Sequence, residues 1–300
     1  MILFQQRRDF GEKLNATFAF VTENIRGLGL SLLFIVGPVA LVGGVFSGYA
    51  QAGVMGDAAS LGGAAGDPNK LFAVYARMFS GTMLIGVVVQ VMAYILTNLV
   101  TFAYIRLYQE RRGDQQIEVS AVWEETQRYI GSGVLLSIAI SFITVFAMLL
   151  LIIPGIYVGI VLTLAPAILV FERKDVGQSI SRSFKLITDK WWSTLGLMFV
   201  VSIVVGIMSM VFTLPAGIMG GLFGAGVLKD ITIMTVIIQA LAAVGTSVLR
   251  GLSAVAIAFQ YFNLVELKEG TGLIGQIDSI GETPTRPGTL QQAREEEGEY

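Results

Sequence analysis

One apolar run constrains the fold of this chain more than any other feature. The 40 residues from Ser132 to Phe171 contain no charged side chain. A helix rises about 1.5 Å per residue, so a single helix of this length would extend roughly 60 Å, twice the ~30 Å hydrocarbon core of a bilayer. The run therefore predicts two membrane spans, at 133–152 and 156–171. Because Pro154 lacks an N–H group and Gly155 permits a tight turn, we place the hinge between them at these two residues.

Four further apolar runs bring the predicted number of spans to six. They extend over 27–49, 79–104, 193–212 and 231–265. Ordinary soluble domains carry about 25% charged residues, whereas this chain of 300 residues is 54% hydrophobic and 14% charged. So few charges cannot cover a water-exposed surface. We therefore predict an all-α polytopic membrane protein whose six-span domain extends over 27–270.

Glycine, proline and small residues mark the expected loops. The segment 50–70 is rich in Gly, Ala and Ser, and Leu214-Pro215 with the glycines that follow is expected to end the fifth span. Within the spans, Gly44 and Gly206 are examples of small residues that let helices approach closely or, alternatively, line a path. Beyond Gly270 the tail, 271–300, ends in a run of three glutamates and is predicted to be largely disordered.

Charged amphipathic segments lie before the first span, after the second and after the fourth. In 1–26, apolar residues recur every three to four positions with charges between them, which predicts an amphipathic helix. Such a helix can lie on the membrane surface or pack on the protein's own loops. The segments 105–131 and 172–190 show similar patterns and carry most of the other cations.

The distribution of Lys and Arg predicts the orientation. Sixteen of these residues lie in the N-terminal segment, in 105–131, in 172–190 and in the tail, against three in the loops 50–78 and 213–230. Cytoplasmic loops carry the excess of cations. We therefore expect both termini in the cytoplasm, as an even number of spans requires.

The composition argues against most enzyme classes. The chain contains no cysteine and no histidine, which excludes disulfides, thiol nucleophiles, Ser-His-Asp chemistry and the usual zinc sites within it. It has no glycine-rich phosphate-binding motif, and its net charge of −2 favours no nucleic acid. We expect neither enzymatic activity nor a cofactor or metal. The expected partners are membrane lipids, with a protein partner or a second copy of the chain also open.

Arg250 and the cations after the fourth span are the candidate ligand- or lipid-binding residues. Arg250 is the one charge within the last apolar run. A charge at mid-bilayer costs ~2.5 kcal/mol or more. If that span begins at Ile231, the arginine lies at the inner interface and can reach lipid phosphates; if the span begins near Ala240, it must face a cavity or a partner. The other candidates are Arg173, Lys174, Arg182 and Lys185, which sit among carboxylates in a segment that we interpret as a solvated, salt-bridged helix rather than a catalytic carboxylate pair.

The segment from Leu149 to Leu197 resembles a known membrane family. It reads LLLIIPGIYVGIVLTLAPAILVFERKD, then SISRSFKLI and KWW, and a second likeness lies in FQYFNLVE at 259–266. These motifs are similar to the membrane domain of the glycerophosphoryl diester phosphodiesterase family. The likeness of the segment 259–266 to bacterial membrane proteins implies a location in the inner membrane of a bacterial cell. The phosphodiesterase activity of that family resides in a separate soluble barrel that uses catalytic histidines and metal-binding carboxylates. The resemblance therefore implies a membrane module and not an activity.

Two functions remain as hypotheses at this point. The first is a non-catalytic module that organises lipid or a partner protein at the inner leaflet, because the charges and amphipathic segments gather on one side. The second is a transporter of a lipidic or anionic small molecule, which Arg250 and the prolines within the spans favour. A polar cavity that crosses the membrane and reaches Arg250 would favour the transporter, and a closed bundle would favour the module.

Overall fold

The computed structural model describes residues 2–59, 72, 74–77, 79–111, 116–228 and 231–270. Within these residues the chain forms helices and no strand, so the prediction of an all-α fold is confirmed. Six helical stretches in this part are long and apolar enough to cross a membrane, as the apolar runs predicted: Ile25–Ala58, Gly81–Glu110, Ile130–Leu150, Ile152–Phe171, Trp191–Gly224 and Thr232–Glu269. The protein is therefore a multi-pass membrane protein.

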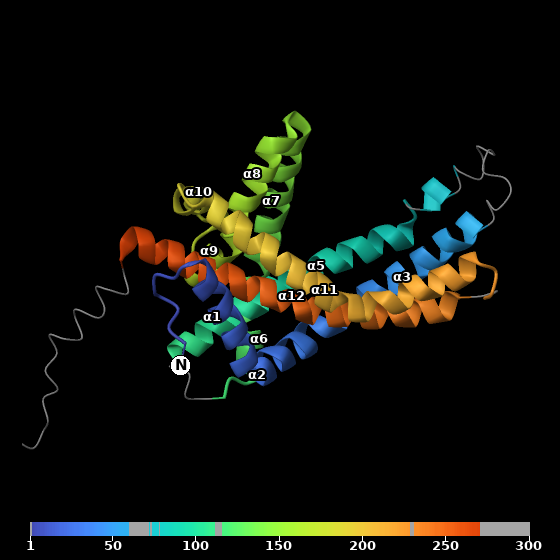
Figure 1. The fold of residues 1–300 in the computed structure, drawn as a ribbon, viewed down its shortest axis with the longest axis horizontal. Coiled ribbons are helices and arrows are strands. Elements are labelled where there is room, and N and C mark those ends of the chain that lie inside the picture. Colours follow the sequence, from blue (N-terminus) through green and yellow to red (C-terminus); the bar gives the residue numbers. More distant parts are fainter. Residues whose placement is uncertain are drawn as a thin grey trace, which may run out of the picture.

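Four long helical stretches run together, and a helical hairpin leaves their side. The first stretch joins α2 (Ile25–Ser31), a π-helical turn η1 (Leu32–Val36) and α3 (Gly37–Ala59). It runs with α5 (Gly81–Glu110), α11 (Trp191–Gly224) and α12 (Thr232–Glu269). Figure 1 shows the hairpin of α7 (Ile130–Leu150) and α8 (Ile152–Leu162) pointing away from the direction of the long helices.

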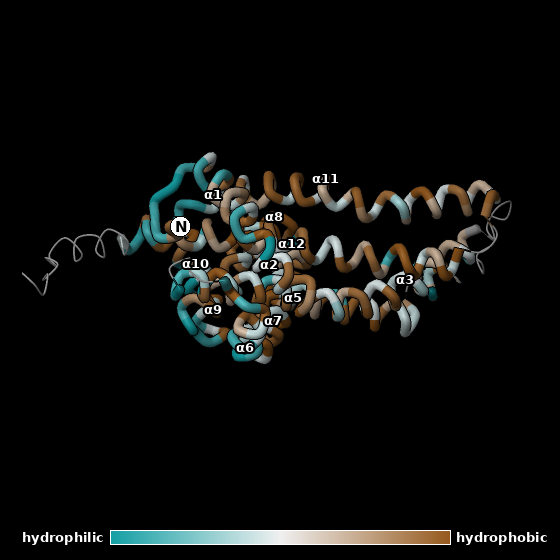
Figure 2. The backbone as a smooth tube through the Cα atoms, turned by 90° about the horizontal axis from the view of Figure 1, so that it is seen from below, coloured by the Kyte–Doolittle hydropathy of each residue, from teal (hydrophilic) through white to brown (hydrophobic). Residues whose placement is uncertain are grey.

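Short helices gather at one end of the long ones. They are α1 (Phe10–Glu23), α6 (Val119–Gln127), α9 (Ala165–Phe171) and α10 (Val176–Ile187). Figure 2 shows hydrophilic residues concentrated around α1, α6 and α10, whereas α11 is largely hydrophobic. We call the region of these four short helices the polar end.

The N-terminal helix is shorter than predicted. It does not begin at residue 1 but at Phe10, because Asp9 caps it: the Asp9 carboxylate accepts from the N–H of Glu12 and the Glu12 carboxylate accepts from the N–H of Asp9. This reciprocal capping box fixes the start of the helix. The predicted tail 271–300 and residues 60–70 of the predicted loop 50–70 lie outside the described residues.

Two predicted loop boundaries are wrong. Helix α3 continues to Ala59 through the Gly- and Ala-rich segment that we predicted to be a loop. Helix α11 continues to Gly224 with Pro215 in its interior. In an apolar environment, ending a helix exposes several backbone groups without partners, whereas an internal proline removes one hydrogen bond. Helix therefore persists where propensity alone predicts a stop.

The hinge between the third and fourth spans lies at Leu151, and not at Pro154-Gly155 as predicted. Leu151 is extended, with φ −157° and ψ 138°, and joins α7 directly to α8. Pro154 lies in the first turn of α8, where its missing N–H would have had no partner in the helix. A Cβ on Gly155 would lie 2.7 Å from the Met148 Cα, so this glycine lets the two arms of the hairpin meet.

The C-terminal half of α12 forms the centre of the polar end. Nearly every residue from Gly251 to Glu266 is buried there, on all sides of the helix. A buried polar side chain is costly unless it is hydrogen-bonded. The backbone N–H of Arg8 donates to Asn263 Oδ1 at 2.8 Å, and Gln260 Nε2 donates to Thr194 Oγ1 at 2.8 Å. These bonds tie the N-terminal segment and α11 to α12.

Lys13 of α1 enters the same buried layer. Its side chain is 2% exposed, and Nζ donates to Gln260 Oε1 at 2.9 Å and to Ser193 Oγ at 3.0 Å. Burial lowers the pKa of Lys13, and the nearby Asp9 offsets part of this effect. Helix α1 therefore packs on α12 of the protein itself, and its contact with the membrane surface remains a prediction.

Glycines bring α3 against α12 at contact distance. A Cβ on Gly44 would lie 2.6 Å from the Ala240 Cα, and a Cβ on Gly48 would lie 2.6 Å from the Val236 Cα. The small-residue interpretation therefore holds for Gly44. It fails for Gly206 of α11, whose added Cβ would have no atom within 4 Å.

We expect Gly44→Ala and Gly48→Ala to destabilise the protein, because each methyl group would push against the backbone of α12. Overpacking of this kind costs about 1–3 kcal/mol. Gly206→Ala is the matched control and should leave the melting temperature unchanged or slightly higher, since alanine favours helix. Thermal unfolding in detergent measures all three. Equal melting temperatures for Gly44→Ala and Gly206→Ala would contradict the close approach.

Candidate functional site

A cavity of about 470 Å³ lies at the base of the α7–α8 hairpin. Its walls come from α5, both arms of the hairpin, α9 and α12. Pockets of roughly 300–1,000 Å³ commonly hold small ligands. The lining is mainly apolar and contains these residues: Val91, Tyr94, Ile95, Asn98, Leu99, Gly133, Ser137, Ile140, Ser141, Thr144, Val145, Gly159, Leu162, Thr163, Pro166 and Ile257. We call this space the hairpin cavity.

The hairpin cavity opens sideways, between α5 and α7. Three of its lining residues are about half exposed on the outer surface: Val91 at 50%, Tyr94 at 51% and Val145 at 56%. Both helices belong to stretches long and apolar enough to cross a membrane. A ligand would therefore enter this cavity from among the lipids.

The polar groups of the lining are hydroxyls and one amide. Ser137 Oγ donates to the Gly133 carbonyl at 2.8 Å, Thr163 Oγ1 to the Ile160 carbonyl at 2.7 Å, and Asn98 Nδ2 to the Tyr94 carbonyl at 3.1 Å. The buried Thr144 Oγ1 has no hydrogen-bond partner among the described residues. Since the lining contains no charged side chain, it suits a ligand that is apolar or carries an uncharged polar group there.

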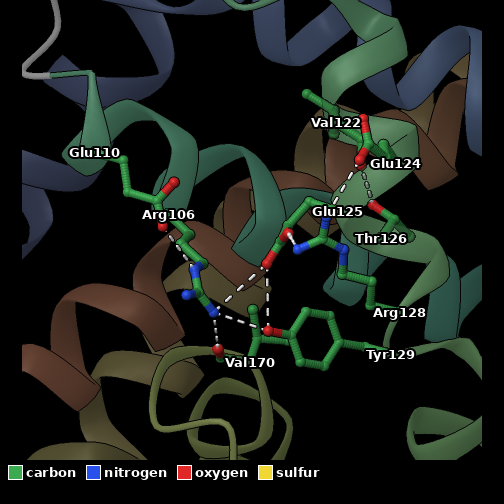
Figure 3. A network of polar contacts seen from close by, with 9 residues as sticks. All are labelled: Arg106, Glu110, Val122, Glu124, Glu125, Thr126, Arg128, Tyr129 and Val170. Carbon is green, nitrogen blue, oxygen red and sulfur yellow. Dashed lines mark hydrogen bonds and ion pairs between the residues drawn. The ribbon is translucent and has the colours of Figure 1, made fainter.

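An ionic network lies next to the cavity on its polar side. Arg106 Nη1 donates to Tyr129 Oη at 2.8 Å and to the Val170 carbonyl at 3.0 Å, and it lies 3.5 Å from Glu125 Oε1. Its Nε pairs with Glu110 at 3.0 Å. Figure 3 shows this guanidinium between Glu110 on one side and Glu125, Tyr129 and Val170 on the other. Arg106 thus joins α5 to α6, α7 and α9.

The network lies about one helical turn beyond the lining of the cavity. Tyr129 precedes the lining residue Gly133 by four residues, and Val170 follows the lining residue Pro166 by four. Each step is about one helical turn. Burial raises the pKa of the Tyr129 hydroxyl, and Arg106 lowers it in part, so the hydroxyl stays protonated and donates to Glu125 Oε1 at 3.3 Å.

A second ionic cluster surrounds Glu172, directly after α9. Its carboxylate accepts from Arg182 Nε at 3.1 Å, from Tyr261 Oη at 3.0 Å and from Lys174. Arg182 also pairs with Glu269 at the end of α12. Burial alone would raise the pKa of Glu172, but the hydrogen bonds from Lys174 and Arg182 outweigh it and hold the pKa below its usual value.

The structure brings only some of the predicted binding residues together. Lys174 and Arg182 both turn inward to Glu172, as the salt-bridge interpretation of this segment predicted. Arg173 is exposed, has a positive φ of 51°, and lies near Tyr129. Lys185 is exposed on α10. These four residues therefore surround the polar end but do not form one pocket.

Arg250 lies apart from both ionic clusters. Helix α12 begins at Thr232, which is the early start that placed this arginine at the interface. About 27 Å of helix separates Thr232 from Arg250 at 1.5 Å per residue. The side chain is exposed on the outside of α12 and is not part of the cavity lining. Its binding of lipid phosphate remains a prediction.

None of the binding residues predicted from the sequence lines the hairpin cavity. Asn98 is the clearest signal, because an amide side chain within an apolar span is uncommon and needs a partner. Arg106 and Glu125 entered only as charges of a polar segment. Their pairing depends on how α6 folds back onto α5, which helical periodicity does not reveal.

Comparisons with protein-family models, curated proteins and solved structures give no match to this chain. Among the described residues there is also no group of three or more Asp or Glu side chains placed to hold a metal ion. We therefore infer a function from the geometry of the hairpin cavity and its two neighbouring ionic clusters.

We expect Arg106→Lys to lower the free energy of unfolding by about 1–3 kcal/mol, because a lysine cannot reproduce the fork that reaches Glu110, Tyr129 and Val170 together. Arg128→Lys, in the same network, is the control: the Arg128 side chain is 57% exposed, and within the described part of the chain its ion pairs are with Glu124 and Glu125 of α6. It should have little effect. Thermal unfolding in detergent distinguishes the two, and equal effects would show that Arg106 does not join the helices.

Acid should weaken the Glu172 cluster. A glutamate whose pKa is lowered by folding adds stability above its unfolded pKa, about 4.3, and loses it as the pH falls through the folded value. The melting temperature should therefore drop as the pH falls from about 5 to about 3, and Glu172→Gln should lower it at pH 6 and shorten that drop. Glu124→Gln, at a side chain 77% exposed, is the control. An unchanged drop in Glu172→Gln would contradict the assignment.

Proposed function

We propose that this protein is a non-catalytic integral membrane module that binds and organises lipid at the inner leaflet. The observation that carries the proposal is the hairpin cavity: about 470 Å³, mainly apolar and open sideways between two membrane helices. Its polar side meets the Arg106 network. An apolar space beneath a charged layer matches the division of a lipid into chain and headgroup.

The side assignments rest on charge. Lys and Arg concentrate in the segments 1–26, 105–131 and 172–190, which contain α1, α6 and α10, and cytoplasmic segments of membrane proteins carry such an excess. We therefore propose that the polar end faces the cytoplasm of a bacterial cell and that both termini lie there. Exposed cations of this end, Arg173 and Lys185, would face anionic headgroups, where each contributes about 1 kcal/mol.

The resemblance to the phosphodiesterase membrane domain supports a membrane module as well. Two of its motifs fall on features described above: IPGI on the first turn of α8, and FERKD on the Glu172 cluster. The 300 residues contain no histidine, which that family's catalytic barrel requires. We accordingly propose no catalytic role for these residues.

The transporter hypothesis has less support. It required a polar cavity that reaches Arg250, whereas the hairpin cavity is mainly apolar and its lining does not include that residue. A sideways opening into lipid fits retention of a membrane component better than passage of a solute from one aqueous side to the other.

We expect Ser141→Phe to reduce the lipid that co-purifies with the protein several-fold. Ser141 lines the cavity and is exposed, so a ring at this position would occupy the space without displacing the core. Ile138→Phe is the matched control on the same helix, because Ile138 is 61% exposed and is not part of the lining. Native mass spectrometry of the purified variants, followed by lipid extraction, measures the retained lipid.

Two results would contradict the proposal. One is a wild-type protein that retains no lipid after mild purification. The other is equal retention by Ser141→Phe and Ile138→Phe when both variants unfold at the wild-type temperature.

A further inference from the structure

The α7–α8 hairpin contacts the rest of the protein near the base of α7 and through α8, where Tyr157 stacks on Trp191 of α11. Within α7, Gly133 and Leu136 are the buried residues, and both lie in the first two turns. A Cβ on Gly133 would lie 2.9 Å from the Leu99 side chain of α5, which marks the base. Ile140 is the last residue of α7 that packs on the hydrophobic core, and the later part of the hairpin points away from the long helices in Figure 1.

The tip of the hairpin is apolar throughout. The five residues 149–153 are Leu or Ile and are exposed by 79, 67, 66, 72 and 81%. No polar side chain occurs from Val145 to Ile156. A connection at a membrane surface usually carries polar turn residues. In water, each of these five large apolar side chains would lack the stabilisation of about 1.5–3 kcal/mol that burial gives. The tip is therefore more stable among acyl chains.

Length and direction together keep the tip of the hairpin short of the far side of the membrane. From Leu99 back to Gly81, the first residue of α5, is about 27 Å at 1.5 Å per residue. From Gly133 to Leu150 is about 26 Å on the same basis. The tip would therefore reach the level of Gly81 only if α7 ran alongside α5. Because the hairpin diverges from the long helices in Figure 1, its tip falls short.

The turn is built to leave few free backbone groups. Leu151 N–H donates to the Ala147 carbonyl at 3.1 Å, and Gly155 N–H donates to the Leu151 carbonyl at 3.2 Å. Pro154 has no N–H to satisfy. In hydrocarbon each backbone group without a partner costs several kcal/mol. A connection of one residue, with proline in the following first turn, suits a site without water.

We propose that the α7–α8 hairpin enters the bilayer from the polar end and ends inside the hydrocarbon core. Its tip, residues 149–153, contacts acyl chains and not water on the opposite side. The chain then crosses the membrane four times, by the stretch α2–α3 and by α5, α11 and α12. Both ends of the hairpin stay on one side, so the charge distribution is equally satisfied. The inference does not depend on lipid occupying the hairpin cavity.

Depth measurement at single cysteines tests this placement, because the natural chain contains none. The variants are Ile153→Cys at the tip, Ser181→Cys on the exposed face of α10 and Val227→Cys after the end of α11, where Val227 is 66% exposed. Each purified variant receives a nitroxide in detergent and is reconstituted into phosphatidylethanolamine–phosphatidylglycerol vesicles. Collision with oxygen and with a water-soluble nickel complex then reports the depth of the label.

We expect the label at position 153 to collide with oxygen at least several-fold more than with nickel, and the labels at 181 and 227 to show the reverse. Leu150→Cys, one residue before the turn, repeats the measurement should the first variant fold poorly. A nickel-accessible label at both 150 and 153 would overturn the proposal. An impermeant maleimide that reacts at 153 from the same side as at 227 would also overturn it, since the hairpin would then cross.

Discussion

The buried half of α12 is the constraint on which the rest of the polar end depends. A helix enclosed on every side must find a partner for each of its polar side chains, because water is not available to them. Gln260 takes its partners from α1 and α11, Asn263 from the N-terminal segment, and Tyr261 from Glu172 after α9. Each partner lies on a different element. Providing hydrogen-bond partners for the polar side chains of this one helix therefore fixes the placement of the elements that surround it.

The hydropathy pattern located the long apolar helices. The helix ends that were predicted wrongly from the sequence share one physical cause. The apolar runs marked six helical stretches correctly, since only a helix satisfies the backbone of a single segment in lipid. The same argument explains why α3 passes through its Gly- and Ala-rich end and why α11 passes Pro215. Propensities measured in water overstate the breaking effect of glycine and proline there. The hinge moved from Pro154 to Leu151 because a proline is favoured in the first turn of a helix.

The candidate site was less accessible from the sequence. Its lining extends from Val91 to Ile257, and no local pattern says that these residues meet. The cavity exists because α7 and α8 leave the long helices at an angle, which depends on the packing of Gly133 on Leu99 and on the Arg106 bridge. Asn98 within an apolar run was a usable signal. The pairing of Lys174 and Arg182 with Glu172 agreed with the salt-bridge interpretation, whereas Arg250 stayed on the outer surface.

The sideways opening of the hairpin cavity changes the quantity that governs its occupancy. Val91, Tyr94 and Val145 border the opening, so whatever enters has first partitioned into the membrane. Binding then follows the mole fraction of the ligand among the lipids and not its concentration in water. Diluting the cells leaves that fraction, and hence the occupancy, unchanged. A change in lipid composition alters it directly, which makes the cavity responsive to the makeup of the surrounding membrane.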